Sequence, residues 1–442
     1  MRIPIERSLA KSLAGFVKEN KSNNKKQLNM SKRIFLCLAH MSEDGIEQKY
    51  IQKAFDDNYV VPLGPNVNQF EEELEAYMGQ GKQVVALSCG TAAVHLALIA
   101  CGVGPGDEVC VQSFTFCASS HPITYLGAKP VFIGSEADTW NMDPVLLEAA
   151  IKDRIATTGR KPKAIIPVAL YGMPYRIEEI MEIAEKYGIP VIEDAAEGFG
   201  SEYKGQRLGT FGRYGVLSFN GNKMITTSGG GALVCPDDEA ASKIMWYATQ
   251  AREAYPYYQH EAIGYNYRMS NICAGIGIGQ MTVADAHVAH HRHIAAMYRE
   301  AFAKVDGIDF HDGSIEGSNF WLNTITLSPS LNIKGQENAY SVAVQGAVGG
   351  AAGVVHGGGS LHTDCEPNAN VEAMRVYLDK AGIEARPLWK PMHKQPVYAE
   401  AAAYTNGIEE ELFKCGMCLP SGPCVTDDDV RYIIEKILEA IA

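Results

Sequence analysis

Between Gln83 and Val234, short β-branched apolar runs alternate with amphipathic segments of helix length. The runs typical of strands are QVVALS, DEVCVQS, KPVFIG, KAIIPVAL, IPVIED, YGVLSFN and GGALVC. Helical segments between them include AAVHLALIACGV, PVLLEAAIKDR and IEEIMEIAEKYG. Strands that alternate with helices pair mainly in parallel, and helices cover both faces of the sheet. The pattern predicts an α/β fold that binds its ligand at the carboxyl ends of the strands.

The pattern changes near residue 306, which predicts a large domain over residues 34–306 and a smaller C-terminal α/β domain over 307–442. Further helices are expected at EQKYIQKAFDDN, QFEEELEAYMG, SKIMWYATQAREA and MTVADAHVAHHRHIAAMYREAFAKV in the large domain. In the small domain we expect a strand around NFWLNTITL and helices at NVEAMRVYLDKAG and DDDVRYIIEKILEAI.

Two segments are expected to lack a packed structure. Residues 334–370 form an insertion rich in Gly, Ala and Val, with little large apolar surface to offset the cost of backbone ordering. Residues 1–33 are locally basic and are predicted to form a poorly ordered extension. A short amphipathic helix is the alternative for the first half of that extension.

Composition excludes several classes of protein. The net charge of -13 argues against a nucleic-acid binder, and no apolar run approaches the roughly 18 residues of a membrane span. Eleven cysteines lie singly in the sequence, mostly in apolar stretches, which favours a reducing compartment and predicts a cytoplasmic protein. Cys415 and Cys418 form one C-x-x-C without a second ligand pair, so we expect no metal site.

A lysine ends the most informative loop. SFNGNK, from Ser218 to Lys223, follows a predicted strand and precedes a triple glycine at 229–231. A lysine in such a place can reach into a pocket and form an imine with an aldehyde. Glycines let the backbone approach a flat cofactor. A surface loop that contains a lysine by chance is the alternative.

Two other segments place polar groups at the same edge of the sheet. Asp194, after the strand IPVI, either opposes the pyridine nitrogen of pyridoxal 5'-phosphate (PLP) or caps a helix. Ser88-Cys89-Gly90-Thr91 opens a helix, where free N–H groups bind phosphate or are capped. Phe114 and Phe116 either stack on a ring or fill the core. Together the three segments supply different parts of one cofactor site.

These segments resemble the sugar-nucleotide aminotransferases of DegT/StrS type. The matching residues run from YVVPLGP through SCGT, GDEV, SFTF, EDAAE, SFNGNK and TSGGGALV to GYNYRMSN, and resume in NFWL and RPLWKPMHKQP. The resemblance implies fold type I of the PLP-dependent transferases, the aspartate-aminotransferase type. It also implies a homodimer with shared active sites, and PLP as the cofactor.

The resemblance assigns roles to the residues around the cofactor ring. Lys223 would form the Schiff base and carry protons, and Asp194 would face the pyridine nitrogen. Phe116 would stack on the ring. Glu197 would lie beside the ring hydroxyl, where many relatives carry Gln or His.

For the cofactor phosphate, the resemblance implies ligands from both subunits. Gly90, Thr91 and Ser218 would hold the phosphate from one subunit. Asn266, in GYNYRMSN, would reach it from the partner, with Arg268 as a weaker candidate.

The substrate prediction rests on RPLWKPMHKQP. Its Arg386, Trp389, Lys390 and His393 offer an aromatic face and cations for a base and a pyrophosphate, although a turn with a surface Trp is the alternative. The resemblance implies ping-pong transfer, from L-glutamate, to C4 of a UDP-linked 4-keto-6-deoxy-N-acetylhexosamine in polysaccharide or glycan synthesis.

Two rival functions fit the same resemblance. A sugar dehydratase of this fold carries histidine in place of the Schiff-base lysine, and position 223 is lysine. A regulatory or ligand-binding protein could keep the fold without turnover, but every expected site residue is present.

Overall fold

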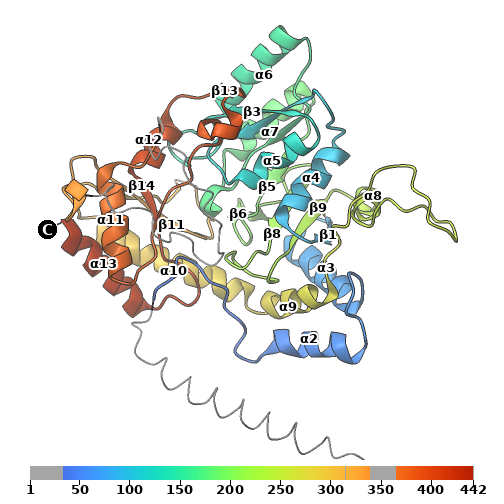
Figure 1. Ribbon diagram of the computed structural model, residues 1–442, viewed down its shortest axis with the longest axis horizontal. Helices are drawn as coiled ribbons and strands as arrows, with labels where there is room; N and C mark the ends of the chain where they lie inside the picture. Colours follow the sequence, from blue (N-terminus) through green and yellow to red (C-terminus); the bar gives the residue numbers. More distant parts are fainter. Residues whose placement is uncertain (1–32, 314, 339–364, 442) are drawn as a thin grey trace, which may run out of the picture.

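The computed structural model describes residues 33–313, 315–338 and 365–441 (Figure 1). The predicted N-terminal extension, apart from Arg33, and most of the predicted insertion over 334–370 lie outside these residues. No helix within the described ranges has the length and apolar character to cross a membrane.

The main sheet consists of two groups of four strands. One group has the order β1 (Gln83–Leu87), β9 (Gly231–Cys235), β8 (Tyr214–Ser218) and β5 (Ile192–Asp194). The other has the order β13 (Ala402–Tyr404), β3 (Lys129–Ile133), β2 (Glu108–Gln112) and β4 (Ala164–Ile166). Parallel bridges from Ile165 to Val191 and from Val168 to Asp194 join the groups. Only the pairings of β9 are antiparallel, which confirms the predicted mainly parallel sheet.

Both faces of this sheet are buried, as the continuous apolar strands predict. Val84 and Ala86 of β1 belong to one hydrophobic cluster, whereas Val85 and Leu87 belong to another, because successive side chains point to opposite faces. The first cluster includes residues of α3 (Pro65–Met78), α6 (Pro144–Thr158), α7 (Ile177–Tyr187) and α9 (Asn271–Met281). The second includes residues of α4 (Gly90–Ala100), α5 (His121–Tyr125) and α8 (Asp238–Ala248).

Helix α9 was not expected, because its sequence NICAGIGIGQM contains three glycines. The glycines allow close packing against α2 (Ile46–Asp56) and α3. A Cβ at Gly275 would lie 3.1 Å from the Cβ of Tyr50, and one at Gly277 would lie 2.6 Å from the ring of Phe70. Tertiary contact therefore stabilises a helix that intrinsic propensity disfavours.

Another difference concerns the end of α8, which was expected to continue to Ala254. The helix ends at Ala248 because Gln250 and Ala251 have positive φ values of 65° and 50°. Isolated bridges from Thr249 to Asn266 and from Arg252 to His260 then form an arm over residues 249–266. This arm projects away from the body of the molecule beyond α8 (Figure 1).

The C-terminal part builds a second, antiparallel sheet in the order β10 (Ile308–Phe310), β11 (Asn323–Leu327), β14 (Gly416–Leu419) and β12 (Arg386–Pro387). It shares a separate core with α10 (Ala284–Phe302), α11 (Ala369–Lys380) and α13 (Asp427–Ile441). The remaining elements are α12 (Ile408–Cys415), the hairpin β6 (Glu202–Tyr203) and β7 (Gln206–Arg207), and the 3₁₀ turns Cys117–Ser119, Leu170–Gly172, Gln336–Asn338, Met392–Lys394 and Pro396–Tyr398.

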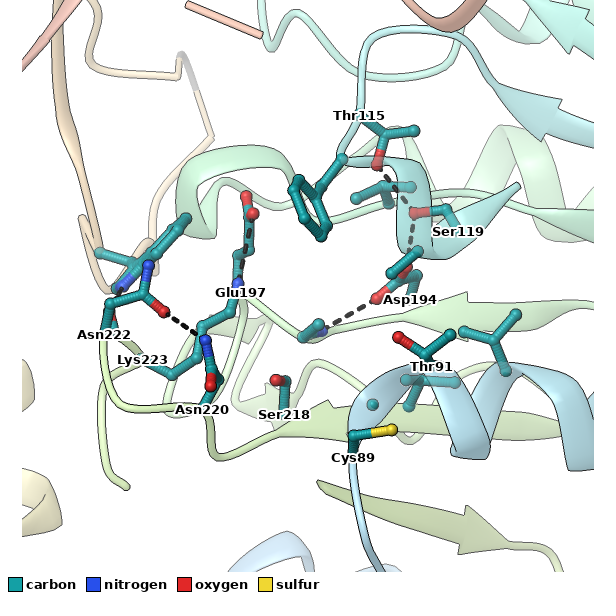
Figure 2. A pocket seen from close by; sticks show the side chains of 18 of the residues that line it. Cys89, Thr91, Thr115, Ser119, Asp194, Glu197, Ser218, Asn220, Asn222 and Lys223 are labelled. Carbon is teal, nitrogen blue, oxygen red and sulfur yellow. Dashed lines mark hydrogen bonds and ion pairs between the residues drawn. The ribbon is translucent and has the colours of Figure 1, made fainter. Parts of the chain in front are cut away.

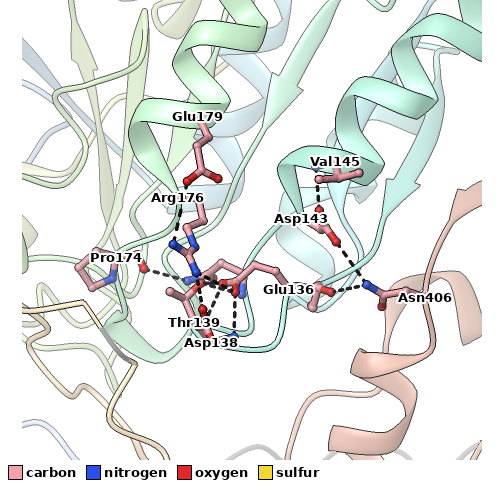
Figure 3. A network of polar contacts seen from close by, with 11 residues as sticks. Glu136, Asp138, Thr139, Asp143, Val145, Pro174, Arg176, Glu179 and Asn406 are labelled. Carbon is pink, nitrogen blue, oxygen red and sulfur yellow. Dashed lines mark hydrogen bonds and ion pairs between the residues drawn. The ribbon is translucent and has the colours of Figure 1, made fainter.

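Two segments cross the domain boundary expected after residue 306. Ile34 bridges Ile383 in the C-terminal part, and β13 extends the main sheet beside β3. After β13, Asn406 donates to the backbone oxygen of Ser135 at 2.9 Å and to Asp143, which caps α6 (Figure 3). Each part of the chain thus contributes a segment to the structure of the other, and the division at 306/307 stays a prediction.

Candidate active site

A cavity of about 290 Å³ opens at the carboxyl ends of β5 and β8 and at the N-terminus of α4 (Figure 2). The predicted site residues that line it are Gly90, Thr91, Phe116, Asp194, Glu197, Ser218, Lys223 and Trp389. Their elements are far apart in sequence, yet the sheet brings their ends together. This is the edge at which parallel sheets bind ligands.

The N-terminus of α4 forms the floor of one end of the cavity. Cys89 is its N-cap, and its sulfur accepts from the N–H of Ala92 at 3.4 Å. The start of β9 packs tightly against this helix end, since a Cβ at Gly231 would lie 2.4 Å from the nitrogen of Gly90. The first N–H groups of a helix lack intrahelical partners and attract anions. With the hydroxyls of Thr91 and Ser218 beside them, they suit a phosphate group.

Asp194 ends β5 inside the cavity and is 3% exposed. Its Oδ2 accepts from Oγ of Ser119 at 2.7 Å, and its Oδ1 accepts from the N–H of Ala196 at 3.1 Å. Burial raises the pKa of the Asp194 carboxyl, while these two hydrogen bonds and the charge of Lys223 act in the opposite direction. A protonated pyridine nitrogen is the kind of cation that such a buried carboxylate stabilises.

Lys223 extends from its loop toward the same space. Its Nζ lies 3.4 Å from Oε1 of Glu197 and 4.0 Å from the ring centre of Trp321. Glu197 is buried, and its Oε2 accepts from the N–H of Tyr171 at 2.7 Å. Burial raises the pKa of Glu197, and the nearby lysine opposes this shift. The arrangement holds one amine between a carboxylate and an aromatic face.

Aromatic side chains form another part of the wall. The ring centres of Phe116 and Trp389 lie 5.6 Å apart, and those of Trp389 and Tyr171 lie 6.1 Å apart. The Tyr171 hydroxyl also accepts from the backbone N–H of Trp389 at 2.9 Å. Phe116 remains 51% exposed, so a flat ligand can still cover its ring. Phe114, by contrast, is fully buried and fills the core.

Four predicted residues do not line the cavity. Arg386 pairs with Glu384 at 2.6 Å, and Lys390 lies outside the lining. The ring of His393 lies between Oγ of Ser113, at 2.6 Å, and Glu410, at 2.9 Å, so it anchors the Trp389 segment. Asn266 lies at the base of the 249–266 arm.

Arg268, the weaker candidate for the phosphate, is committed elsewhere. Its guanidinium forms a buried, bidentate ion pair with Glu71 and also donates to the backbone oxygen of Ala86. The guanidinium thus fixes the segment after the arm to α3 and β1. The sequence showed its charge but not this partner.

Sequence analysis missed Ser119, Thr115, Trp321, Asn220 and Asn222, which also line the cavity. Thr115 and Ser119 form a hydrogen-bonded chain to Asp194, with their oxygens 2.8 Å apart. Their position after β2 was the only available signal. Trp321 comes from the C-terminal part, and nothing in the sequence placed it against Lys223.

The fold and this set of groups define a PLP-dependent enzyme of fold type I. A helix N-terminus for a phosphate, a buried carboxylate for a pyridine nitrogen and a lysine for an aldehyde occur in one cavity of suitable shape. The model of the DegT/DnrJ/EryC1/StrS aminotransferase family matches residues 42–344 and 359–438, and the chain belongs to this family. It is therefore a PLP-dependent sugar aminotransferase.

Relatives agree with this assignment. EpsN of Bacillus subtilis (strain 168), named as a pyridoxal phosphate-dependent aminotransferase, is 45% identical over 92% of this chain and 96% of its own. GDP-perosamine synthase of Caulobacter vibrioides is 33% identical over 89% of this chain and 95% of its own. UDP-2-acetamido-2-deoxy-3-oxo-D-glucuronate aminotransferase of Pseudomonas aeruginosa is 39% identical over 53% of this chain and 63% of its own. A crystal structure of a DegT DnrJ EryC1 StrS aminotransferase from Brucella abortus superposes with a TM-score of 0.77 at 27% identity. The superposition covers 90% of this chain and 96% of that one.

Proposed function

We propose that the protein transfers an amino group from L-glutamate to C4 of a nucleotide-linked keto sugar, a UDP-4-keto-6-deoxy-N-acetylhexosamine, for a surface polysaccharide or glycan. The observation that carries amino transfer is the Lys223 amine, which faces Glu197 in the cavity that also contains Asp194. Relatives named for a UDP-linked oxo sugar and for GDP-perosamine support a nucleotide-linked substrate.

In this proposal, the chain holds PLP through groups at both ends of the cavity. The N–H groups and hydroxyls of Gly90, Thr91 and Ser218 bind the phosphate, and Asp194 pairs with the pyridine nitrogen. Phe116 covers the ring. When bound, PLP supplies an aldehyde that exchanges amino groups and a ring that accepts electrons from the carbon that loses its proton.

Lys223 carries the proton in both halves of the reaction. Its Nζ is the basic amine that lines the cavity, and the side chain is long enough to move between the two carbon atoms that exchange the proton. Glu197 accepts a hydrogen bond from this amine and orients it. Because one amine performs both transfers, loss of Lys223 should stop turnover completely.

The sugar nucleotide would enter past Phe116 and Trp389, whose rings offer a face for a sugar or base. Lys390, next in sequence, and Arg386 are candidates for the pyrophosphate at this entrance.

We propose a cytoplasmic homodimer with shared sites. The 249–266 arm exposes Tyr258 and Ile263, at 79% and 82%, which are apolar groups that a second copy would bury. In such a dimer, Asn266 at the base of the arm would reach the partner's phosphate site. None of the eleven cysteines, which all lie in the described part of the chain, forms a disulfide, and this supports a reducing compartment.

The test supplies PLP-loaded protein with ¹⁵N-glutamate and three acceptors: a UDP-4-keto-6-deoxy-N-acetylhexosamine, a GDP-4-keto-6-deoxyhexose and a dTDP-3-keto-6-deoxyhexose. Mass spectrometry should detect ¹⁵N in the UDP-sugar product, with the highest kcat/KM for that acceptor. Lys223→Ala should give no product while remaining folded. A higher kcat/KM for either other acceptor would overturn the substrate, and product formation by Lys223→Ala would overturn the mechanism.

A further inference from the structure

We propose that Trp321 is a positioning residue that holds the Lys223 ammonium whenever the lysine is not bonded to the cofactor. This inference rests on the proposed role of Lys223. It adds a holding position for the free amine, built from a side chain that belongs to the C-terminal part of the chain.

The first observation is the contact itself. Nζ of Lys223 lies 4.0 Å from the centre of the Trp321 ring, and Oε1 of Glu197 lies 3.4 Å from the same nitrogen. An ammonium group over an indole face is attracted by the ring quadrupole, and the attraction strengthens where water is excluded. Lys223 is 13% exposed and Trp321 is 1% exposed, so this contact is desolvated.

The second observation is that the indole cannot turn away. Its Nε1–H donates to the backbone oxygen of Asn222 at 2.7 Å, directly before Lys223 in sequence. Its backbone N–H donates to Oδ1 of Asn319 at 2.8 Å, and its backbone oxygen accepts from Ser421 at 2.7 Å. One hydrogen bond therefore holds the indole ring, and two more hold the backbone that carries it.

The third observation links the holding position to the cofactor site. Nδ2 of Asn319 donates to the backbone oxygens of Glu197 and Phe199, at 2.9 and 2.8 Å. The same asparagine thus fixes the backbone of both residues whose side chains contact the Lys223 amine. Glu197 and Trp321 together form a holder for the Lys223 amine, which the loop 220–223 carries.

The holder has a chemical purpose. A lysine released from the cofactor must stay close to the reacting carbon atoms and must neither leave the cavity nor react again too early. Trp321 attracts the charged amine without donating or accepting a proton, so it can restrain Lys223 without competing for the proton that it carries. Glu197 alone would bind the ammonium from one side only.

Nuclear magnetic resonance tests whether the Lys223 side chain lies against Trp321, and it requires no measurement of enzyme activity. In cofactor-free protein labelled with ¹³C at lysine Cε, ring currents of Trp321 should move the Lys223 signal away from the other lysine signals. Lys223→Arg identifies the signal by its loss. Trp321→Leu should return it to the ordinary position, and Trp246→Leu, which changes a tryptophan outside the cavity, should leave it unchanged. A Lys223 signal at the ordinary position in the unaltered protein would overturn the proposal.

Steady-state kinetics test whether the Trp321 ring assists turnover. Trp321→Leu should lower kcat about 10-fold, equivalent to ~1.4 kcal/mol, with the KM for glutamate changed less than about 2-fold. Trp321→Phe keeps an aromatic face but loses the bond to Asn222, and should retain most of the activity. Equal losses in both variants would show that only the hydrogen bond matters, and would overturn the role of the ring.

Fluorinated tryptophans placed at position 321 by codon suppression avoid any effect on folding. Fluorine withdraws electron density from the ring face, so each additional fluorine should lower kcat stepwise while the size of the ring changes little. The same series at position 246 serves as the control. A kcat that stays the same across the fluorinated series at position 321 would overturn the proposal. If Lys223→Ala keeps turnover, the proposed function fails separately, and the resonance test still decides where the amine lies.

Discussion

Oγ of Ser119 donates a hydrogen bond of 2.7 Å to Oδ2 of Asp194, and both side chains are buried. Ser119 lies in a 3₁₀ turn after β2, whereas Asp194 ends β5, so the bond joins two parts of the sheet edge. It turns the carboxylate toward the cavity and favours its charged form. The role proposed for Asp194 therefore depends on a neighbour 75 residues away in sequence.

Ser119→Ala should weaken PLP binding and lower kcat/KM by about 10- to 100-fold. A hydrogen bond to a charged group contributes roughly 1.5–3 kcal/mol, and its loss leaves the carboxylate oxygen without this donor. Cofactor fluorescence titration and steady-state kinetics measure the two effects. Ser120→Ala is the matched control, since the Ser120 hydroxyl donates to the backbone oxygen of Cys117 instead. Similar losses in both variants would contradict the assigned role.

Gly231→Ala should destabilise the fold by roughly 1–3 kcal/mol, because overpacking at a site with no room to relax costs about this much. The added Cβ would lie 2.4 Å from the nitrogen of Gly90 and 2.5 Å from the carbonyl carbon of Cys89. PLP binding should weaken as well, since α4 must shift. Gly229→Ala is the control for stability, because its Cβ would meet no atom within 4 Å. Denaturant unfolding of both variants checks this difference.

Glu193 should make stability depend on pH. Burial raises the pKa of its carboxyl from 4.5 to about 7. Between these values the unfolded chain loses the proton while the folded chain keeps it, so stability falls as pH rises, by about 3 kcal/mol in total. Glu193→Gln should remove this fall and should be more stable than the unaltered protein above pH 7.

Denaturant unfolding at pH 5.5 and pH 8.5 measures the effect of Glu193. The exposed Glu182→Gln serves as the control and should leave the pH dependence unchanged. If Glu193→Gln lost stability with pH as steeply as the unaltered protein, another group would be responsible.

If the sites are shared between two subunits, mixing an Asn266→Ala protein with a Lys223→Ala protein should restore activity. A mixed dimer has one site with both changes and one with neither, so a random mixture should reach about a quarter of the original activity. The test assumes that Asn266→Ala alone is strongly impaired. Subunits that exchange, as shown by native mass spectrometry, but stay inactive would exclude Asn266 from the partner's site.

The sequence by itself determined the main sheet and the polar residues at its edge. Period-2 and continuous apolar patterns depend only on local burial, so the seven strands predicted between residues 83 and 235 all form. The short strands β6, β7 and β13 were not predicted. Asp194 and Ser218 each end such a strand, and Lys223 lies in the loop that follows β8. Since the carboxyl ends of parallel strands share one edge, their convergence in a single cavity followed from strand order.

Helix α9 and the true end of α8 needed the tertiary structure. Three glycines disfavour a helix in isolation, and only packing against Tyr50 and Phe70 reverses this preference. Similarly, the positive φ values of Gln250 and Ala251 depend on the arm that follows them. A prediction from neighbouring residues in the sequence cannot include such tertiary effects.

The tertiary structure alone decided which partner each side chain has. The family resemblance made Arg268 a candidate ligand, and its charge made His393 another. Folding instead places Glu71 against Arg268, and Ser113 and Glu410 against His393. Conversely, Trp321 lies 98 residues after Lys223 and still covers its amine. Hydrogen bonds and ring contacts form over a few ångströms in space, and separation along the chain does not determine that distance.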